Sequence, residues 1–580
     1  MSTHVKNFRL RKKHVAALFL SISVVVGVVR FVLYLIPPSK PEDQLIFGLS
    51  AARAFLGIIF LGLLLINIGA VLFTLIDFGP RQKKLKQQLS NIFSNYHTLI
   101  MMALYGVLAV VGAFFLLSIP PIIRPLRFLE PHYIRLSGFL SWILIADLLL
   151  IIMLRMISAE MFRNSQSMRR LDTVFIGVGI FVLTSVLYLR TAILIGWIDK
   201  TVYSFWDLLV GQFIQGKLYL ENPAYTHDLT LYNGRWYVPM PPLPGIMLIP
   251  IALWIGAENI STSYFSMLLS ALNGLLLFLI LKQMAQRKWV RLSGHSMFWL
   301  IVLFLFGTPH LWLGISGRGW YVSQIVTVLF LSLAIYAALR WSSPWLSGTF
   351  LAIAMLARPN SLMSWPFIFA ISMQVMKEKG GSVTWRQAIN WTAKTALPIA
   401  ATAVVLLTYN YLRFENILDF GYTTVNAGPD VVRNVQAHGM FSPHFVPNNL
   451  YVMFLKPPRI NWGTPWPTEP KGALWPIDPT TTGMSILLTT PPLLYLFRRY
   501  PKAWWILGGW VAVLFNVIML STYHNTGAHQ FGYRYIMDFL VPLVMLLAVG
   551  IGKKVPWHFI VLVLVSIVIN LYGAYWFMNG

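Results

Sequence analysis

The chain has 580 residues, of which 57% are hydrophobic and only 11% are charged. A soluble protein of this length carries a much larger charged fraction, so the composition predicts a polytopic integral membrane protein and excludes an ordinary soluble enzyme. The formal net charge is +26, but the lysines and arginines cluster in short loops between apolar runs, where they set orientation and meet anionic lipid head groups. We therefore expect membrane lipids, and no nucleic acid, among the partners.

Apolar runs of spanning length follow one another along the chain, and the first is read as a retained signal anchor because no small-residue cleavage site follows it. These runs lie near residues 14–37, 50–77, 98–119, 136–157, 172–197, 262–284, 295–315, 320–340, 395–412, 504–521, 535–552 and 556–577. Shorter runs near 345–357, 361–376 and 484–498 are read as tilted or kinked helices. The pattern predicts an all-α polytopic membrane protein with about 15 transmembrane helices.

The predicted spans fall into two groups. The first four carry few polar residues outside their loops, which predicts a separate N-terminal membrane module at residues 1–171 and a second module at 172–580. The absence of cysteine excludes disulfides, thiolate metal sites and cysteine nucleophiles from both modules.

Basic clusters in the loops give the predicted orientation. With a cytoplasmic N-terminus, the clusters that begin at Arg9, Arg81, Arg163, Arg287, Lys377, Arg498 and Lys553 all fall on the cytoplasmic face. This holds only if the short apolar run 242–256 does not cross, so we expect it to form an interfacial or re-entrant helix on the outer side. Two large outer loops then follow, at 198–261 and 413–483, and the sequence predicts an extracytoplasmic site.

Acidic residues are scarce, and several of them fall in the first outer loop. Asp199 follows a predicted span, Asp207 lies in an amphipathic stretch among Phe205, Trp206 and Leu208, and Asp228 lies further along. A carboxylate among apolar neighbours needs a partner or a function, so Asp207 is a candidate general base. Simple solvation of a loop acid is the alternative interpretation for each of them.

Arginines on the outer side have aromatic or proline neighbours. Arg235 lies in YNGRWYVP, Arg358 in LARPNS and Arg534 in FGYRYIMD. Such an arginine can hold a phosphate bidentately while aromatic rings hold a lipid or a sugar. Snorkelling of the side chain to the interface is the alternative, and for Arg358 a helix C-cap is a further one.

The spacing of two histidines and the lack of nucleotide-binding motifs bear on which metals and donors the sequence can be expected to bind. His524 and His529 lie in HNTGAH without an acidic residue between them, so substrate hydrogen bonding or simple exposure is favoured there over a metal site. No P-loop and no dinucleotide fingerprint occurs, so a donor, if there is one, would be lipid-borne. The sequence does not indicate a divalent metal or any other cofactor.

From about Asp172 to the C-terminus, an ordered series of motifs resembles the polyprenyl-phosphate-dependent membrane glycosyltransferases of the GT-C superfamily, which include bacterial mannosyl- and aminoarabinosyl-transferases. An acidic residue follows a span, and then come QGKLYL, YNGRWYVPMPPLPGIMLIP, GRGWY, LARPNS, YNYLRFENILDFGY, HGMFSPHFVPNN and QFGYRYIMDFLVP. The sequence has Asp199-Lys200 where the family often has Asp-Glu or Asp-Gly.

The resemblance implies a GT-C-like bundle at 172–580 with outer-face juxtamembrane helices, in the plasma (inner) membrane. It implies inverting transfer of a sugar from a polyprenyl phosphate to a glycan, lipid or protein acceptor at the outer face. Asp199 or Asp207 would be the base, and Arg235, Arg358 and Arg534 would bind the donor phosphate. Further residues expected to bind substrate are Asp228, Tyr237, Tyr533, Tyr535, His524 and His529. A transporter or flippase of a lipid-linked saccharide, or a non-catalytic scaffold, is the alternative.

Overall fold

The computed structural model describes residues 100–106 apart from 102, 166–197, 203–462 and 476–579 apart from 528. The chain divides into two compact units, residues 1–178 and 179–580, each of which is considered by itself. In the first unit the Tyr105 hydroxyl donates to Asp172 at 3.2 Å, and its ring stacks on Phe175. Nearly all of the predicted module 1–171 lies outside the described residues, so its four spans stay a prediction.

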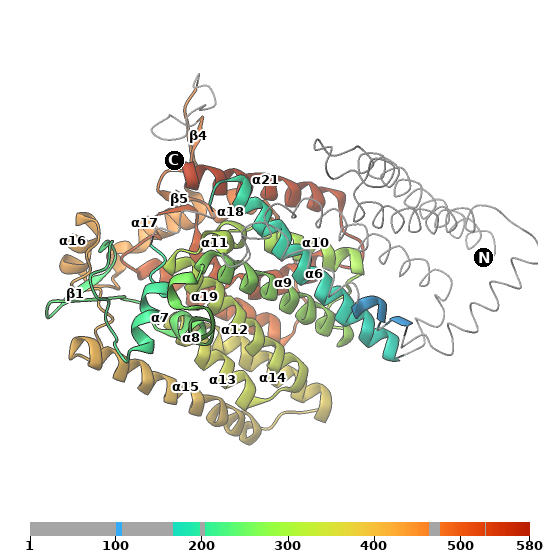
Figure 1. Cartoon of the computed structure of the whole chain (residues 1–580). Helices are drawn as coiled ribbons and strands as arrows, with labels where there is room; N and C mark the ends of the chain where they lie inside the picture. Colours follow the sequence, from blue (N-terminus) through green and yellow to red (C-terminus); the bar gives the residue numbers. More distant parts are fainter. Residues whose placement is uncertain are drawn as a thin grey trace, which may run out of the picture. The chain divides into compact units, whose positions relative to one another are not determined.

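The second unit is mostly helical (Figure 1). After α6 (Gln166–Leu194), its helices are α7 (Trp206–Ile214), α8 (Leu243–Ile255), α9 (Thr262–Gln286), α10 (Gly294–Phe306), α11 (His310–Ser316), α12 (Gly319–Trp341), α13 (Pro344–Met355), α14 (Trp365–Gly380), α15 (Trp385–Phe414), α16 (Pro429–His438), α17 (Val446–Leu450), α18 (Ile486–Thr489), α19 (Trp504–Thr522), α20 (Leu540–Ile551) and α21 (Trp557–Asn579). Short helical turns are η3 (Ala257–Asn259), η4 (Pro359–Ser364), η5 (Pro443–Phe445), η6 (Tyr451–Leu455), η7 (Pro491–Leu496) and η8 (Arg534–Asp538).

Strands occur only as short pairs in the part of the chain that the structure describes. β1 (Thr230–Tyr232) pairs antiparallel with β2 (Arg235–Tyr237), and β3 (Arg459–Ile460) pairs antiparallel with β4 (Ile477–Asp478). β5 (Thr482–Met484) pairs in parallel with β6 (Gln530–Gly532). Each pair shapes a loop and none forms a layer, so the unit is an all-α bundle with loop hairpins.

Among the described residues, six helices are long and apolar enough to cross a membrane: α6, α9, α12, α15, α19 and α21. The number rises to seven if α10 and α11, which meet at a bend of 51°, count as one broken span. The predicted span 295–315 breaks here because Pro309, just before α11, has no amide hydrogen to continue the helical ladder. The predicted polytopic helical architecture agrees with these helices, whereas a total of about 15 spans is not shown.

The short apolar run 242–256 forms α8, as the sequence predicts. Its 13 residues extend about 20 Å, which is less than the roughly 30 Å of a bilayer's hydrocarbon core. Pro242 caps its start, and α8 packs against α7, where Gly245 leaves room for the ring of Phe213. The helix therefore does not span by length, and it forms a corner beside α7.

Four of the predicted basic clusters lie at one end of this bundle. Arg287, after α9, donates to the Leu339 carbonyl at 2.7 Å and to Glu378 at 3.0 Å. Arg498 donates to the carbonyl of Gly550 at 3.2 Å, next to the cluster that begins at Lys553. Direct contacts therefore join loops that are far apart in sequence.

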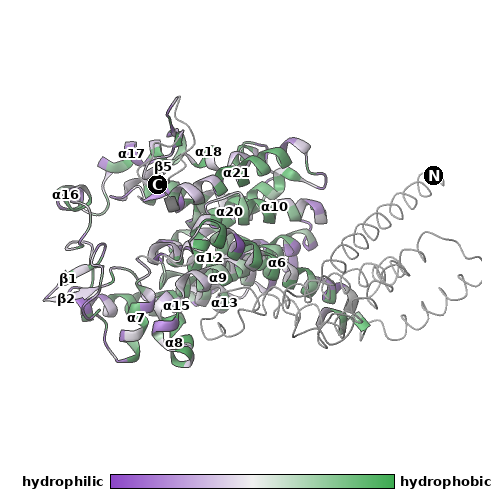
Figure 2. Cartoon of the chain, turned by 45° about the horizontal axis from the view of Figure 1, so that its top comes forward, coloured by the Kyte–Doolittle hydropathy of each residue, from purple (hydrophilic) through white to green (hydrophobic). Residues whose placement is uncertain are grey.

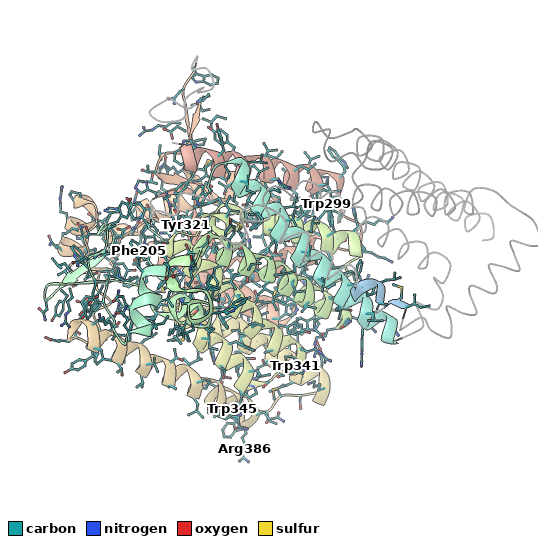
Figure 3. All side chains as sticks on the ribbon, viewed as in Figure 1. Phe205, Trp299, Tyr321, Trp341, Trp345 and Arg386 are labelled. Carbon is teal, nitrogen blue, oxygen red and sulfur yellow. The ribbon has the colours of Figure 1, made fainter. Side chains whose placement is uncertain are left out.

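The opposite end carries β1, β2 and α16, and α12 connects the two ends (Figures 1 and 3). Tyr321 lies in the first turn of α12 and Trp341 at its last residue, so about 30 Å of helix separates them. Green, hydrophobic ribbon dominates the helices between the ends (Figure 2). The two ends of the bundle therefore differ: one end carries the basic loops and the other carries the hairpin loops.

An outward apolar surface lies along α15. Leu397, Val404 and Leu412 on this helix are 58%, 62% and 63% exposed, although all are large aliphatic side chains. Exposing an apolar surface of this kind to water costs free energy, whereas contact with lipid chains does not. The exposure agrees with a helix that faces lipid.

Gly314 on α11 tests the packing of the bundle. A Cβ added there would meet the Tyr188 ring at 2.7 Å and come still closer to Ser270 Oγ, whereas one added at Gly179 meets nothing within 4 Å. We expect Gly314→Ala to destabilise the fold by about 1–3 kcal/mol through overpacking. Gly179→Ala should be neutral or stabilising by up to about 1 kcal/mol. Thermal unfolding of both variants in detergent measures the difference, and equal melting temperatures would contradict the packing of α6, α9 and α11.

Candidate functional site

A cavity of about 1200 Å³ opens among the loops at the hairpin end of the bundle. Its walls come from the segment before β1, the starts of α12 and η4, the loop before α16, and the ends of α19 and α21. Six of the predicted site residues line it: Asp228, Arg358, His524, His529, Arg534 and Tyr535. Segments more than 300 residues apart in sequence therefore meet at one site.

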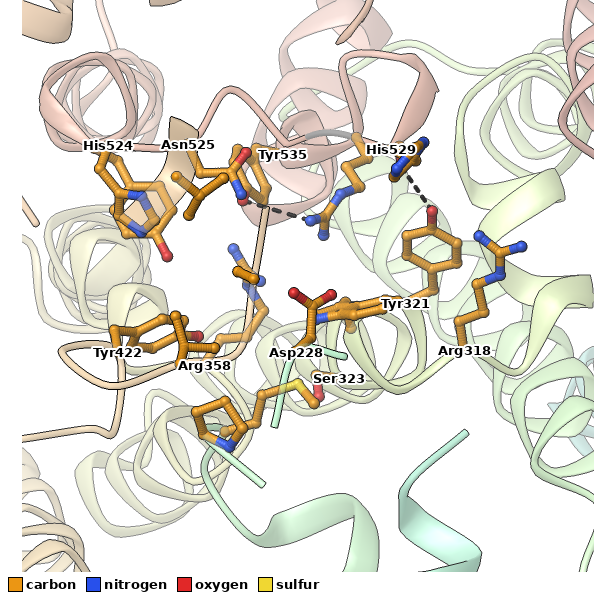
Figure 4. A pocket seen from close by; sticks show the side chains of 18 of the residues that line it. Asp228, Arg318, Tyr321, Ser323, Arg358, Tyr422, His524, Asn525, His529 and Tyr535 are labelled. Carbon is orange, nitrogen blue, oxygen red and sulfur yellow. Dashed lines mark hydrogen bonds between the residues drawn. The ribbon is translucent and has the colours of Figure 1, made fainter. Parts of the chain in front are cut away.

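Asp228 is a carboxylate that projects into the cavity (Figure 4). Its backbone has a φ of 61° and its amide donates to the carbonyl of Asn426 at 2.7 Å, so a strained conformation is fixed by a hydrogen bond. Burial raises the pKa of Asp228 above its ordinary value, and the charges of His227 and Arg534 oppose that rise. Asp478, on β4, is the other carboxylate among the described lining residues.

Arg534 is a buried cation whose hydrogen bonds all go to neutral groups. The side chain is 4% exposed, and it donates to the Gly527 carbonyl at 2.9 Å and to Gln324 Oε1 at 3.1 Å. Its guanidinium also lies 4.6 Å from the centre of the Tyr535 ring. No carboxylate of a described residue forms an ion pair with it. Its positive charge is therefore available to an anion in the cavity.

Arg318 is a further cation of the cavity lining, and it lies beside Tyr321 (Figure 4), whose ring Arg534 also contacts. Its guanidinium lies 4.7 Å from the ring centre of Phe577, 5.7 Å from Trp197 and 6.0 Å from Tyr203. The Tyr321 hydroxyl donates to the carbonyl of His529 at 2.7 Å and so joins α12 to the loop before β6. Arg318 is not among the predicted site residues, although the glycines beside it in SGRGWY allow a ligand to approach the backbone closely.

Arg358 also lines the cavity, but its charge already has a partner. Its Nε and Nη2 donate to the two carboxylate oxygens of Asp538, each at 2.9 Å, and Asn360 donates to the same carboxylate at 2.8 Å. Asp538 is 1% exposed, so this is a buried bidentate ion pair between the start of η4 and the end of η8. A phosphate contact at Arg358 would share the guanidinium with Asp538.

The two predicted histidines line opposite ends of the cavity (Figure 4). His524 lies beside Tyr523, at 4.4 Å between ring centres, and near Tyr422, at 6.1 Å. Burial lowers the pKa of His524 to about 4, so the ring is neutral at physiological pH. Burial also lowers the pKa of His529, and the charges of Arg318 and His227 lower it further.

Other predicted residues lie away from the cavity or outside the described chain. Asp207 is the second residue of α7, where a helix dipole favours an acid, and it accepts a hydrogen bond from Ser204 at 2.5 Å. Arg235 lies over the Tyr219 ring at 4.5 Å. Tyr237 and Tyr533 are buried outside the lining. Asp199 lies outside the described residues, so its role as a base stays a prediction.

No group of three or more histidine, aspartate or glutamate side chains suited to a metal ion occurs in the part of the chain that the structure describes. The cavity instead combines guanidinium groups, neutral aromatic donors and the Asp228 carboxylate. Such a lining can hold an anion, hydrogen-bond hydroxyl groups and accept a proton.

The Arg358–Asp538 pair gives a stability prediction. Replacing Asp538 with Asn leaves the Arg358 guanidinium, which is 18% exposed, without its counter-charge, so we expect a destabilisation of about 2–4 kcal/mol. Glu221→Gln is the matched control, because the side chains of its pair with Lys217 are 31% and 47% exposed and such a surface pair contributes at most about 1 kcal/mol. Thermal unfolding in detergent compares the two, and a similar small effect of both substitutions would refute a structural role for the pair.

The chain was compared with known proteins: no protein-family model, no curated protein and no solved structure matches it.

Proposed function

We propose that this protein is a membrane glycosyltransferase that moves a sugar from a polyprenyl-phosphate donor to an acceptor hydroxyl in the cavity. The observation that carries the proposal is the buried Arg534 guanidinium, which has only neutral partners and shares the cavity with Asp228. An unneutralised buried cation is costly unless an anion binds to it. A lipid-borne phosphate is an anion that reaches a site between apolar helices and outer loops.

The charge change in such a transfer suits this lining. When the bond between the anomeric carbon and the phosphate oxygen breaks, the electron pair stays on the phosphate, whose charge goes from −1 towards −2. Arg534, with Arg318 beyond Tyr321, attracts the product phosphate more strongly than the donor phosphate. Groups that bind developing charge more tightly than ground-state charge lower the barrier.

Asp228 supplies the complementary proton step. The acceptor hydroxyl forms a new bond to the anomeric carbon and loses its proton to the Asp228 carboxylate. Attack from the side opposite the phosphate inverts the anomeric centre. A base with a raised pKa holds the proton better than an ordinary surface aspartate. Asp199 and Asp207 remain the base candidates that the resemblance implies, and Asp228 is the one that lines the cavity.

The orientation of the bundle supports an extracytoplasmic reaction. The basic clusters that begin at Arg287, Lys377, Arg498 and Lys553 gather at the end opposite the cavity. The positive-inside rule favours a cytoplasmic position for that end, and we propose that the cavity opens on the outer face of the plasma (inner) membrane. The acceptor is then a glycan, a lipid or a protein at that face.

The decisive experiment assays sugar transfer from radiolabelled polyprenyl-phosphate sugars to membrane extracts by the purified protein. Asp228→Asn should lower kcat by at least about a hundredfold, because general bases contribute 10²–10⁴-fold. Asp207→Asn and Asp199→Asn are the comparison variants. If Asp199→Asn alone abolishes transfer, Asp228 is not the base. If wild-type protein binds the donor and transfers nothing, the glycosyltransferase proposal fails and uptake by proteoliposomes becomes the relevant assay.

The pH profile of the reaction tests Asp228 independently. The carboxylate must be ionised to accept a proton, so kcat/KM should fall as the pH drops through the raised pKa of Asp228. The acid limb should therefore lie above the range of an ordinary aspartate. The ionised carboxylate also costs folding free energy at neutral pH, so Asp228→Asn should leave the melting temperature unchanged or raise it. A lowered melting temperature would indicate a structural role instead.

A further inference from the structure

Gln324 is a buried amide on α12 that contacts Arg534 and does not itself line the cavity. Its side chain is 0% exposed, and its Oε1 accepts a hydrogen bond from Arg534 Nη1 at 3.1 Å. Its Nε2 donates to the backbone carbonyl of Arg534, also at 3.1 Å. One side chain thus holds both the guanidinium and the main chain of Arg534, so an effect of Gln324 on a ligand in the cavity must act through that arginine.

The other groups that contact the Arg534 guanidinium are also uncharged. Its Nε donates to the carbonyl of Gly527 at 2.9 Å, and the ring centres of Tyr535 and Tyr321 lie 4.6 and 5.4 Å from it. The hydroxyl of Tyr535 is the other side-chain acceptor, at 3.5 Å. Gln324 is therefore the nearer side-chain acceptor of this guanidinium, and an amide oxygen accepts without adding negative charge.

The arginine on η4 shows the alternative arrangement. Asp538, on the same turn as Arg534, accepts two hydrogen bonds from Arg358 and forms an ion pair with it. Asp538 therefore both positions and neutralises its arginine, whereas Gln324 positions its arginine without neutralising it. Glutamate has the length of glutamine and accepts the same hydrogen bond, so charge rather than space distinguishes the two side chains at position 324.

We propose that Gln324 is a positioning residue that holds the Arg534 guanidinium at the cavity wall and, because its amide is uncharged, leaves the positive charge available to the phosphate of the ligand. Gln324 thereby sets the preference of the cavity for an anionic lipid over a neutral one. A carboxylate in its place would form an ion pair with Arg534, and a phosphate would then meet a neutralised arginine. This inference rests on the proposed function, which supplies polyprenyl phosphate as the anion.

Binding of two lipids to the purified protein in detergent, followed by quenching of tryptophan fluorescence, tests the proposal without requiring turnover. Polyprenyl phosphate and polyprenol share the lipid chain, so the ratio of their dissociation constants measures the preference for the anion. Gln324→Glu should lower this preference at least about tenfold, by weakening the binding of the phosphate and leaving that of polyprenol unchanged. Gln324→Met, which has a similar length and keeps the charge of Arg534 unpaired, should weaken phosphate binding less, through the lost positioning bonds alone.

Asn410→Asp is the matched control. Asn410 accepts from Nη2 of the buried Arg413 at 3.0 Å and donates to the carbonyl of Ile417 at 3.1 Å, so it holds an arginine much as Gln324 does. Neither Asn410 nor Arg413 lines the cavity. The same change from amide to carboxylate should therefore leave the preference for the phosphate unchanged at this position.

The outcomes separate the inference from the proposed function. An unchanged preference in Gln324→Glu, or an equal loss in Asn410→Asp, would overturn the role of charge. Unchanged phosphate binding in Gln324→Met would overturn the positioning role. If both variants of Gln324 lose polyprenol binding together with phosphate binding, the residue supports the fold and the inference is wrong. If wild-type protein binds polyprenyl phosphate no more tightly than polyprenol, the proposed function itself fails.

Discussion

The burial of charge in an apolar helical bundle is the constraint on which this structure depends. The charge of Arg358 is compensated by a bidentate pair with Asp538, which connects η4 to η8. Arg534 lies on the same short turn, η8, and donates only to neutral acceptors. Arg358 therefore has a carboxylate as its hydrogen-bond partner, whereas Arg534 has only neutral ones, and the proposed function assigns that unpaired charge to the phosphate of the donor. The position of η8 thus fixes both the wall of the cavity and its charge.

The loops around the cavity depend on similar long-range bonds. Arg413, at the end of α15, is 2% exposed and donates to the carbonyl of Val238 at 2.7 Å, directly before the proline-rich corner that leads into α8. Thr230 donates to the carbonyl of Gly421, where a positive φ of 89° turns the chain toward the hairpin. Prolines at the corner need no backbone donors, and Arg413 supplies the fixed point. The cavity therefore has stiff walls although loops build it.

Electrostatic character varies along the cavity, and the proposed chemistry follows that variation. Arg318 and Arg534 flank Tyr321, Asp228 lies between the ends, and the rings of Tyr422 and Tyr523 lie beside His524. In the proposed reaction the guanidinium groups bind the phosphate and the Asp228 carboxylate accepts the proton.

The sequence by itself predicted a polytopic helical protein, the positions of the six long apolar helices among the described residues and the shortness of α8, because lipid crossing requires about 20 apolar residues and that pattern is local. It did not separate the predicted span 535–552 into η8 and the 12-residue α20. Of the residues that line the cavity, two of the four arginines and two of the three histidines were among its predicted site residues. Only the tertiary structure decided which candidates share a cavity. Asp228 lines it, whereas Asp207 lies in the first turn of α7 and accepts from Ser204. Arg358 is paired with Asp538 across 180 residues, and Arg534 contacts Gln324 across 210. Burial and charge pairing depend on such distant neighbours, which no local pattern records.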